Sequence, residues 1–101
     1  MTQFSDLLIG SARLKILELL RKTNGYALNH QVIAMALENM GLNFSRDQVR
    51  SELGWLAEQR ALTICDVGTM IVAELTERGH DVAKGVSQIR GIDRPLPGSG
   101  L

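Results

Sequence analysis

One stretch of the sequence, from Leu42 to Leu75, restricts the possible folds more than any other. Residues 45–48, Ser-Arg-Asp-Gln, have the form of a capping box and predict the start of a helix that runs to about Arg60. Residues 62–75 then alternate between apolar and polar positions, as the two strands of a hairpin do, around a tight turn at Val67-Gly68. The stretch is therefore predicted to be a helix followed directly by a β-hairpin.

Two helices are predicted ahead of this unit. The first runs from Ser11 to Thr23 and ends at Asn24-Gly25, a pair that commonly stops a helix in the left-handed conformation. The second follows Asn29, which is a favourable N-cap, and stops at Gly41. Its buried stripe is expected to consist of Val32, Ile33, Ala36, Leu37 and Met40.

The order of the predicted elements identifies the fold class. Three helices, a two-stranded hairpin and a short fourth helix from Thr76 to about Lys84 make a winged helix-turn-helix, mainly α with a small β-hairpin. The chain has 101 residues, and we expect one domain over residues 11–85. Residues 1–10 are expected to be a lead, either flexible or an early helical turn. Residues 86–101 are expected to be a mobile tail, because apolar density falls there.

Composition limits where the protein works and what chemistry it can perform. The sequence has no basic leader and no run near the roughly 20 apolar residues of a membrane span, so we expect a cytoplasmic protein. Cys65 is the single cysteine, which excludes an internal disulfide, and it is expected to be buried as a small hydrophobe. His30 and His80 lack ligand spacing, and no nucleophile motif or phosphate loop is present. We therefore expect no metal site, no cofactor and no enzymatic activity.

The charge balance argues against strong non-specific binding to nucleic acids but leaves a local site open. Eleven basic and eleven acidic residues give a formal charge of zero. Arg46 and Arg50 share one face near the start of the third helix, the end that enters the major groove in helix-turn-helix proteins. Arginine there can pair with guanine, and Gln48 and Ser51 can add hydrogen bonds. The alternative is a solvated helix face, because the charges of this helix sum to zero.

The predicted wing carries no cation. No Lys or Arg lies between Arg60 and Arg78, whereas a wing that grips DNA normally carries a cation for the phosphates. We favour the interpretation that the wing serves packing or a protein contact. DNA binding would then depend on the third helix and on the basic residues of the first helix, which are Arg13, Lys15, Arg21 and Lys22.

Trp55 lies off the main apolar stripe of the third helix and has two interpretations. It can anchor a protein partner, because tryptophan is enriched at interface hot spots. The interpretation that we favour is that Trp55 packs against the hairpin or the first helix.

Five runs of the sequence resemble those of one protein family. The runs are Gly25–Asn29, Ser45–Leu53, Trp55–Gln59, Val72–Ala83 and Gly91–Pro95. From about Arg13 to Pro97, the chain resembles small Mu-like phage and prophage proteins that are often labelled ArsR-like transcriptional regulators. The resemblance implies a cytoplasmic protein made from a prophage in a bacterial host. It implies no particular functional residues, and the metal-sensing cysteine pairs of ArsR repressors have no counterpart here.

Two functional hypotheses follow from these observations. The first is a phage-encoded transcriptional regulator that binds double-stranded DNA, for which a homodimer is one option because paired half-sites mirror a two-fold axis. The second is a protein-interaction module in phage morphogenesis or DNA packaging that binds a phage protein partner and no DNA. The zero net charge, the uncharged wing and Trp55 motivate the second hypothesis.

Overall fold

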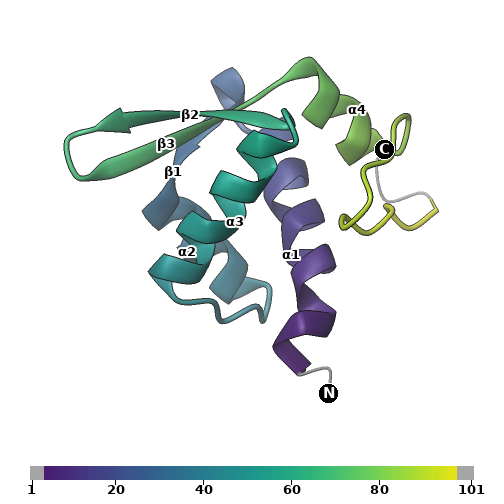
Figure 1. Cartoon of the computed structure of the whole chain (residues 1–101), viewed down its shortest axis with the longest axis horizontal. Coiled ribbons are helices and arrows are strands. Elements are labelled where there is room, and N and C mark those ends of the chain that lie inside the picture. The colour runs from purple at the N-terminus through teal and green to yellow at the C-terminus, as the bar shows by residue number, and fades with distance from the viewer. Residues whose placement is uncertain (1–3, 98–101) are drawn as a thin grey trace.

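The computed structural model describes residues 4–97 and has a winged-helix arrangement with one additional strand (Figure 1). Three helices come first, a β-hairpin follows, and a short helix ends the regular structure, as the sequence predicts. The elements are α1 (Phe4–Arg21), the 3₁₀ turn η1 (Asn24–Tyr26), β1 (Ala27–Asn29), α2 (His30–Asn39), α3 (Arg46–Glu58), β2 (Leu62–Val67), β3 (Met70–Leu75) and α4 (Glu77–Lys84). In Figure 1 the hairpin projects to the left, while α4 and the C-terminal segment lie to the right.

The three strands form one antiparallel sheet in the order β1-β3-β2, so β3 is central. Val67 pairs with Met70, which leaves Gly68 and Thr69 as the two-residue turn, one position later than predicted. Gly68 takes a φ of 63°, a value that glycine adopts easily and that such hairpin turns require. Strand β1 is only three residues long and therefore too short to show an alternation, which explains why the sequence did not predict it.

The side chain of His30 attaches the hairpin to the start of α2. His30 is only 2% exposed, and its Nδ1 accepts a hydrogen bond from the backbone N–H of Ile71 at 3.1 Å. Because β1 ends at Asn29, which lies opposite Val72, the imidazole satisfies the next backbone donor along β3. A buried amide left without a partner costs about 1–3 kcal/mol, so this contact helps to hold the hairpin in place.

The starts of α2 and α3 follow the local sequence signals. The N–H of Gln48 donates to Ser45 Oγ at 3.1 Å, and the N–H of Ser45 donates to Gln48 Oε1 at 2.8 Å, which confirms the capping box. Asn29 caps α2, because its Oδ1 accepts a hydrogen bond from the N–H of Val32 at 2.9 Å. Gly41 follows the end of α2 with a φ of 83°.

One core lies between the helices and the inner face of the sheet. Its largest side chains include Ile16, Leu17 and Leu20 of α1, Ile33 and Leu37 of α2, and Val49, Leu53 and Leu56 of α3. The stripe on α2 is narrower than predicted, because Val32 is 41% and Met40 46% exposed. Residues 30, 33 and 37 form the buried line of this helix, so Val32 and Met40 fall at the edges of the face that packs.

The lead takes one of its two expected forms, whereas the C-terminal segment differs from the expected tail. Helix α1 begins at Phe4, so residues 4–10 are helical, which is one of the two expectations for the lead. Residues 89–93 attach the C-terminal segment to the domain, because Ile89 is 5% and Ile92 7% exposed and the N–H of Asp93 donates to Gly10 O at 3.2 Å. The sequence did not predict this packing, because two isoleucines among prolines and glycines give no periodic pattern. Residues 1–3 of the lead and 98–101 of the tail lie outside the described residues.

Helix α4 packs against α1 and touches the loop between α3 and β2. Thr76 caps α4, because its Oγ1 accepts a hydrogen bond from the N–H of Gly79 at 3.1 Å and donates one to Arg60 O at 2.7 Å. A Cβ at Gly79 would collide with the carbonyl of Ala61, so this close approach requires glycine. Among the described residues, no helix has the length and apolar character to cross a membrane.

Candidate nucleic-acid interface

Along the centre of the outward face of α3, two small residues lie between two acidic residues. Val49, Leu53 and Leu56 define the inner face of this helix. At 3.6 residues per turn, the opposite line consists of Asp47, Ser51, Gly54 and Glu58. A Cβ at Gly54 would meet nothing within 4 Å, so packing inside the protein does not require glycine there.

Two arginines flank this line on the side of the hairpin. Arg46 and Arg50 are both exposed and lie one turn apart at the start of α3, as predicted. The Nη2 of Arg50 donates a hydrogen bond to the carbonyl of Thr69, in the hairpin turn, at 3.3 Å. Within residues 4–97, Arg46 has no hydrogen bond or ion pair. Arg50 therefore lies where α3 and the hairpin tip meet, and Arg46 lies one turn before it on the same side of α3.

A shallow cleft of about 350 Å³ separates α3 from the hairpin tip. Its lining residues are Arg50, Asp66, Gly68, Thr69, Met70 and Ile71. Arg50 is the cation and Asp66 the acid of this cleft, so its charges balance. Thr69 was not among the residues predicted from the sequence, because a turn residue gives no local signal of contact with a helix 19 residues earlier.

Gln48 and Ser51 are exposed at the same end of α3. The capping box uses Oε1 of Gln48, which orients the side chain and leaves its amide N–H groups as donors. Ser51 lies on the central line between Asp47 and Gly54. All four predicted contact residues of α3 are thus exposed on its N-terminal half, but helix geometry places Gln48 on the flank of Glu52 and Trp55, opposite Arg46 and Arg50.

Arg13 does not join this surface. Its Nε forms an ion pair with Glu52 Oε1 at 2.6 Å, and its Nη1 donates to Gly91 O at 3.0 Å. The guanidinium carbon lies 3.6 Å from the centroid of the Trp55 ring. The side chains of Arg13 and Glu52 are each only 16% exposed. Arg13 therefore joins α1, α3 and the C-terminal segment, and we leave it out of the interface.

Trp55 packs in this same junction. Its ring is half-buried against the core, and a Cβ at Gly91 would come within 3.1 Å of it. The contact with Arg13 of α1 agrees with the packing interpretation, whereas the contact with the C-terminal segment was not predicted. This packing removes the reason to treat Trp55 as an exposed anchor for a partner.

Lys15 is the other residue of α1 that the sequence suggested for DNA contact. Its side chain is 44% exposed, and its Nζ lies 3.7 Å from Glu18 Oε1, one turn along the helix. Because the ammonium group of Lys15 is solvent-exposed and the distance is long, this ion pair contributes little to stability. Lys15 is therefore accessible, but it lies on a different helix from Arg46 and Arg50.

The hairpin presents an apolar outer face. Strand alternation and register place Cys65, Val67, Met70 and Val72 on the face opposite the buried Ala73, with Thr63 and Glu74 on the same face farther from the turn. Cys65 is exposed, which corrects the expectation that it is buried, and Val67 is 59% exposed. The error arose because Cys65 lies one position out of phase with the inward-facing residues. Neither strand carries Lys or Arg.

Sequence comparison relates the chain to phage proteins. It is 40% identical over 93 residues to the uncharacterized protein gp26 of Escherichia phage Mu, covering 92% of this chain and 96% of gp26. The chain belongs to the family of phage Mu gp26. An uncharacterized protein of Haemophilus influenzae is 38% identical over 76 residues, which is 74% of each chain.

These relatives confirm the resemblance to Mu-like phage proteins. Both are uncharacterized, so their names indicate no activity for this chain. No protein-family model matches the sequence. No solved structure matches it either. The function must therefore be argued from the surface itself.

Proposed function

We propose that this protein is a phage transcriptional regulator that binds double-stranded DNA through the N-terminal half of α3 and the hairpin tip. The observation that carries the proposal is the exposed pair Arg46 and Arg50 at the start of α3, with Arg50 in contact with Thr69. In helix-turn-helix proteins, this end of the second helix of the motif contacts base edges in the major groove.

Each residue of this surface has a physical role in the proposal. The guanidinium groups of Arg46 and Arg50 pair with guanine, each pair discriminating against a wrong base by about 1–3 kcal/mol. Gln48 and Ser51 add hydrogen bonds to bases or phosphates. Gly54 lets the DNA approach the helix closely, since nothing inside the protein occupies the space beside it.

The same charges predict an unusual balance between specific and non-specific binding. The protein has no net charge, and the described hairpin strands have no cation for phosphates. Because the logarithm of the affinity falls by roughly 0.9 per phosphate contact against the logarithm of salt, we expect a shallow salt dependence. Base contacts would then supply most of the discrimination, and a homodimer would double them on a two-fold symmetric site.

The test is a fluorescence anisotropy titration against DNA fragments that flank the gene for this protein, at about 50 and 200 mM salt. We expect one fragment to bind more tightly than a scrambled duplex. The double variant Arg46→Ala/Arg50→Ala should lose discrimination by at least about 25-fold, because two pairs of about 1 kcal/mol or more disappear.

A charge-matched control separates base recognition from general electrostatics. Lys84→Ala/Arg90→Ala removes the same two charges from exposed positions on α4 and the C-terminal segment. This control should bind within about twofold of the wild type at the higher salt concentration, where unspecific attraction is screened. Equal losses in both double variants, or no binding of any fragment at low salt, would reject the proposal.

The outer face of the hairpin favours a second candidate, a protein-interaction module of a phage assembly. Its exposed apolar residues and missing cations suit contact with a protein better than contact with phosphates. Val67→Lys distinguishes the two functions, since Val67 is exposed next to the turn. A DNA-binding wing should gain affinity and steepen its salt dependence, whereas a protein contact should weaken.

A further inference from the structure

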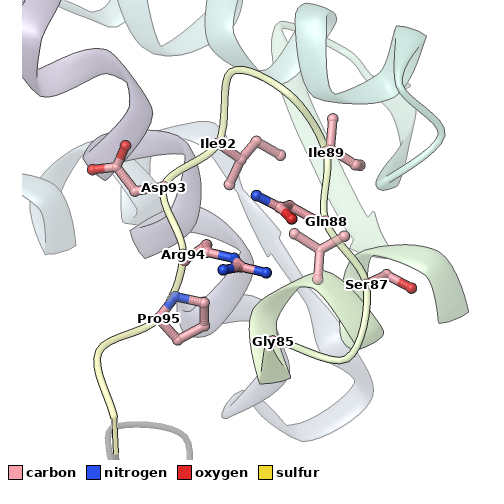
Figure 2. Close-up of a pocket in the computed structure, with 9 residues that line it drawn as sticks. Gly85, Ser87, Gln88, Ile89, Ile92, Asp93, Arg94 and Pro95 are labelled. Atoms are coloured by element: carbon pink, nitrogen blue, oxygen red, sulfur yellow. The ribbon is translucent and has the colours of Figure 1, made fainter.

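A second pocket lies between α4 and the C-terminal segment, at the opposite end of the molecule from the hairpin (Figures 1 and 2). Its volume is about 210 Å³. The apolar part of its lining comes from Val82, Ile89 and Ile92, which are 3%, 5% and 7% exposed, and from Pro95. Its polar lining residues are Ser87, Gln88, Asp93 and Arg94.

Two of these polar side chains point into the pocket. Figure 2 shows the amide of Gln88 and the guanidinium of Arg94 directed into the interior of the loop from opposite sides. Within the described residues, neither side chain has a hydrogen bond or ion pair. The carboxylate of Asp93 points away, toward α1, where it lies so close to Gly10 that a Cβ there would collide with it. Arg94 is therefore the charge that faces the pocket.

Hydrogen bonds weaken the repulsion that the C-terminal end of α4, beside the pocket, exerts on an anion. The last carbonyl groups of a helix carry partial negative charge. They repel an anion when they accept no hydrogen bond. Here the N–H of Gly85 donates to Val82 O at 3.1 Å, and the N–H groups of Val86 and Ser87 donate to Asp81 O at 2.8 and 3.2 Å. These bonds occupy two of the last four carbonyl groups of α4, those of Asp81 and Val82.

We propose that this pocket binds a small carboxylate that carries a short branched aliphatic group. The carboxylate accepts charge-assisted hydrogen bonds from Arg94 and a further one from the amide of Gln88. The aliphatic group lies on Val82, Ile89 and Ile92, where it leaves water. The ligand is small because the volume is below the roughly 300–1,000 Å³ of sites for drug-sized molecules.

The site does not depend on DNA binding, but it shares a segment with the junction at α3. Gly91, between Ile89 and Ile92, is the residue whose carbonyl Arg13 holds. A ligand in the pocket thus contacts the segment that is tied to α3 through Arg13 and Glu52. This position is suitable for an effector of the proposed regulator, although binding itself is tested without DNA.

The experiment is an NMR titration of the ¹⁵N-labelled full chain with sodium isovalerate, with its neutral amide isovaleramide as the matched probe. We expect isovalerate to shift backbone amides of residues 82–95, with a dissociation constant on the order of 1 mM for so few atoms. Isovaleramide should bind about tenfold more weakly, because it lacks the charge that Arg94 recognises.

Two arginine variants locate the interaction. Arg94→Gln should weaken isovalerate binding about tenfold, since a charge-assisted hydrogen bond is lost. Arg90→Gln is the control, because Arg90 is exposed on the same segment but does not line the pocket; it should stay within about twofold. The proposal is overturned by shifts spread over other basic residues, by equal binding of isovaleramide or inorganic phosphate, by equal effects of the two variants, or by no shifts.

Discussion

The two flanks of α3 differ in how completely their charges are satisfied. On the flank toward α1, Arg13 is paired with Glu52, stacked on Trp55 and bonded to Gly91. On the flank toward the hairpin, Arg46 has no partner among the described residues, and Arg50 makes one bond of 3.3 Å to a turn carbonyl. The first flank is a packed junction, and the second leaves its cations to solvent or to a partner.

This difference shows which arginines are candidates for binding. Arg13 is a partly buried cation whose charge is paired and two of whose donors are used, so removing it leaves an uncompensated carboxylate on Glu52. The exposed guanidinium of Arg46 keeps its five donors for a planar acceptor, and that of Arg50 keeps four. Mutations on the first flank should therefore change stability, whereas mutations on the second should change binding. Four predictions test this division, in order of expected effect.

The largest effect is expected for Trp55→Ala, which removes the ring that α1, α3 and the C-terminal segment share. Replacing a fully buried tryptophan with alanine lowers the free energy of unfolding by about 3–5 kcal/mol. We expect a decrease of about 2–3 kcal/mol here, because Trp55 is half-buried. Urea unfolding followed by circular dichroism measures it. Arg50→Ala is the control from the other flank and should change stability by less than about 0.5 kcal/mol. Equal stabilities of the two variants would contradict the comparison.

His30→Leu should lower the free energy of unfolding by about 1–2 kcal/mol, because the partly buried N–H of Ile71 loses its acceptor. His30→Asn is the matched control, since its Oδ1 can take the place of the imidazole Nδ1. Hydrogen exchange at Ile71 should accelerate in the leucine variant more than in the asparagine variant. Faster exchange in the leucine variant would show that the contact of His30 with β3 holds the hairpin in place, rather than the bond from Arg50 to Thr69. Equal exchange in the two variants would argue against it.

Arg13→Met should destabilise the protein by about 1–2 kcal/mol and leave DNA affinity unchanged. The methionine keeps an apolar stem against Trp55 but leaves the carboxylate of Glu52 without its cation. A double-mutant cycle with Glu52→Gln, measured by urea unfolding, should give a coupling energy of about 1 kcal/mol. A large loss of DNA affinity in Arg13→Met, with stability unchanged, would move Arg13 to the binding surface.

Gly54→Ala has the smallest expected effect on stability, and this effect is stabilising. Replacing a helix-interior glycine should stabilise α3 by about 0.5–1 kcal/mol, because the new Cβ meets nothing within 4 Å. If a partner approaches this face closely, the same methyl group should weaken binding while the melting temperature rises. Unchanged DNA affinity in the more stable variant would exclude Gly54 from the contact surface.

The helix starts and the core stripes could be predicted because their causes are local. Ser45 and Gln48 are three residues apart, and one capping box decides where α3 begins. Burial of Val49, Leu53 and Leu56 follows from helical spacing alone. The exposure of Cys65 was missed because its apolar character was given more weight than its position, which alternates with the inward-facing Leu62 and Ile64.

The candidate surface was only partly predictable. Arg46 and Arg50 were found because helix geometry places residues four apart on one side. Arg13 was assigned to the same surface from its charge, and sequence alone gives no sign of its partners, which lie 39 and 78 residues away in Glu52 and Gly91. Thr69 was missed for the same reason.

The sequence by itself determined the element order, the helix caps and the relation to phage Mu gp26, because these depend on neighbouring residues or on residue-by-residue similarity. Only the tertiary structure decided which charges are free and whether residues 86–97 pack, because both depend on contacts between distant parts of the chain. Ile89 and Ile92 are buried in the same core cluster as side chains of α1, α3 and α4. Free charges and pockets are thus properties of the assembled fold.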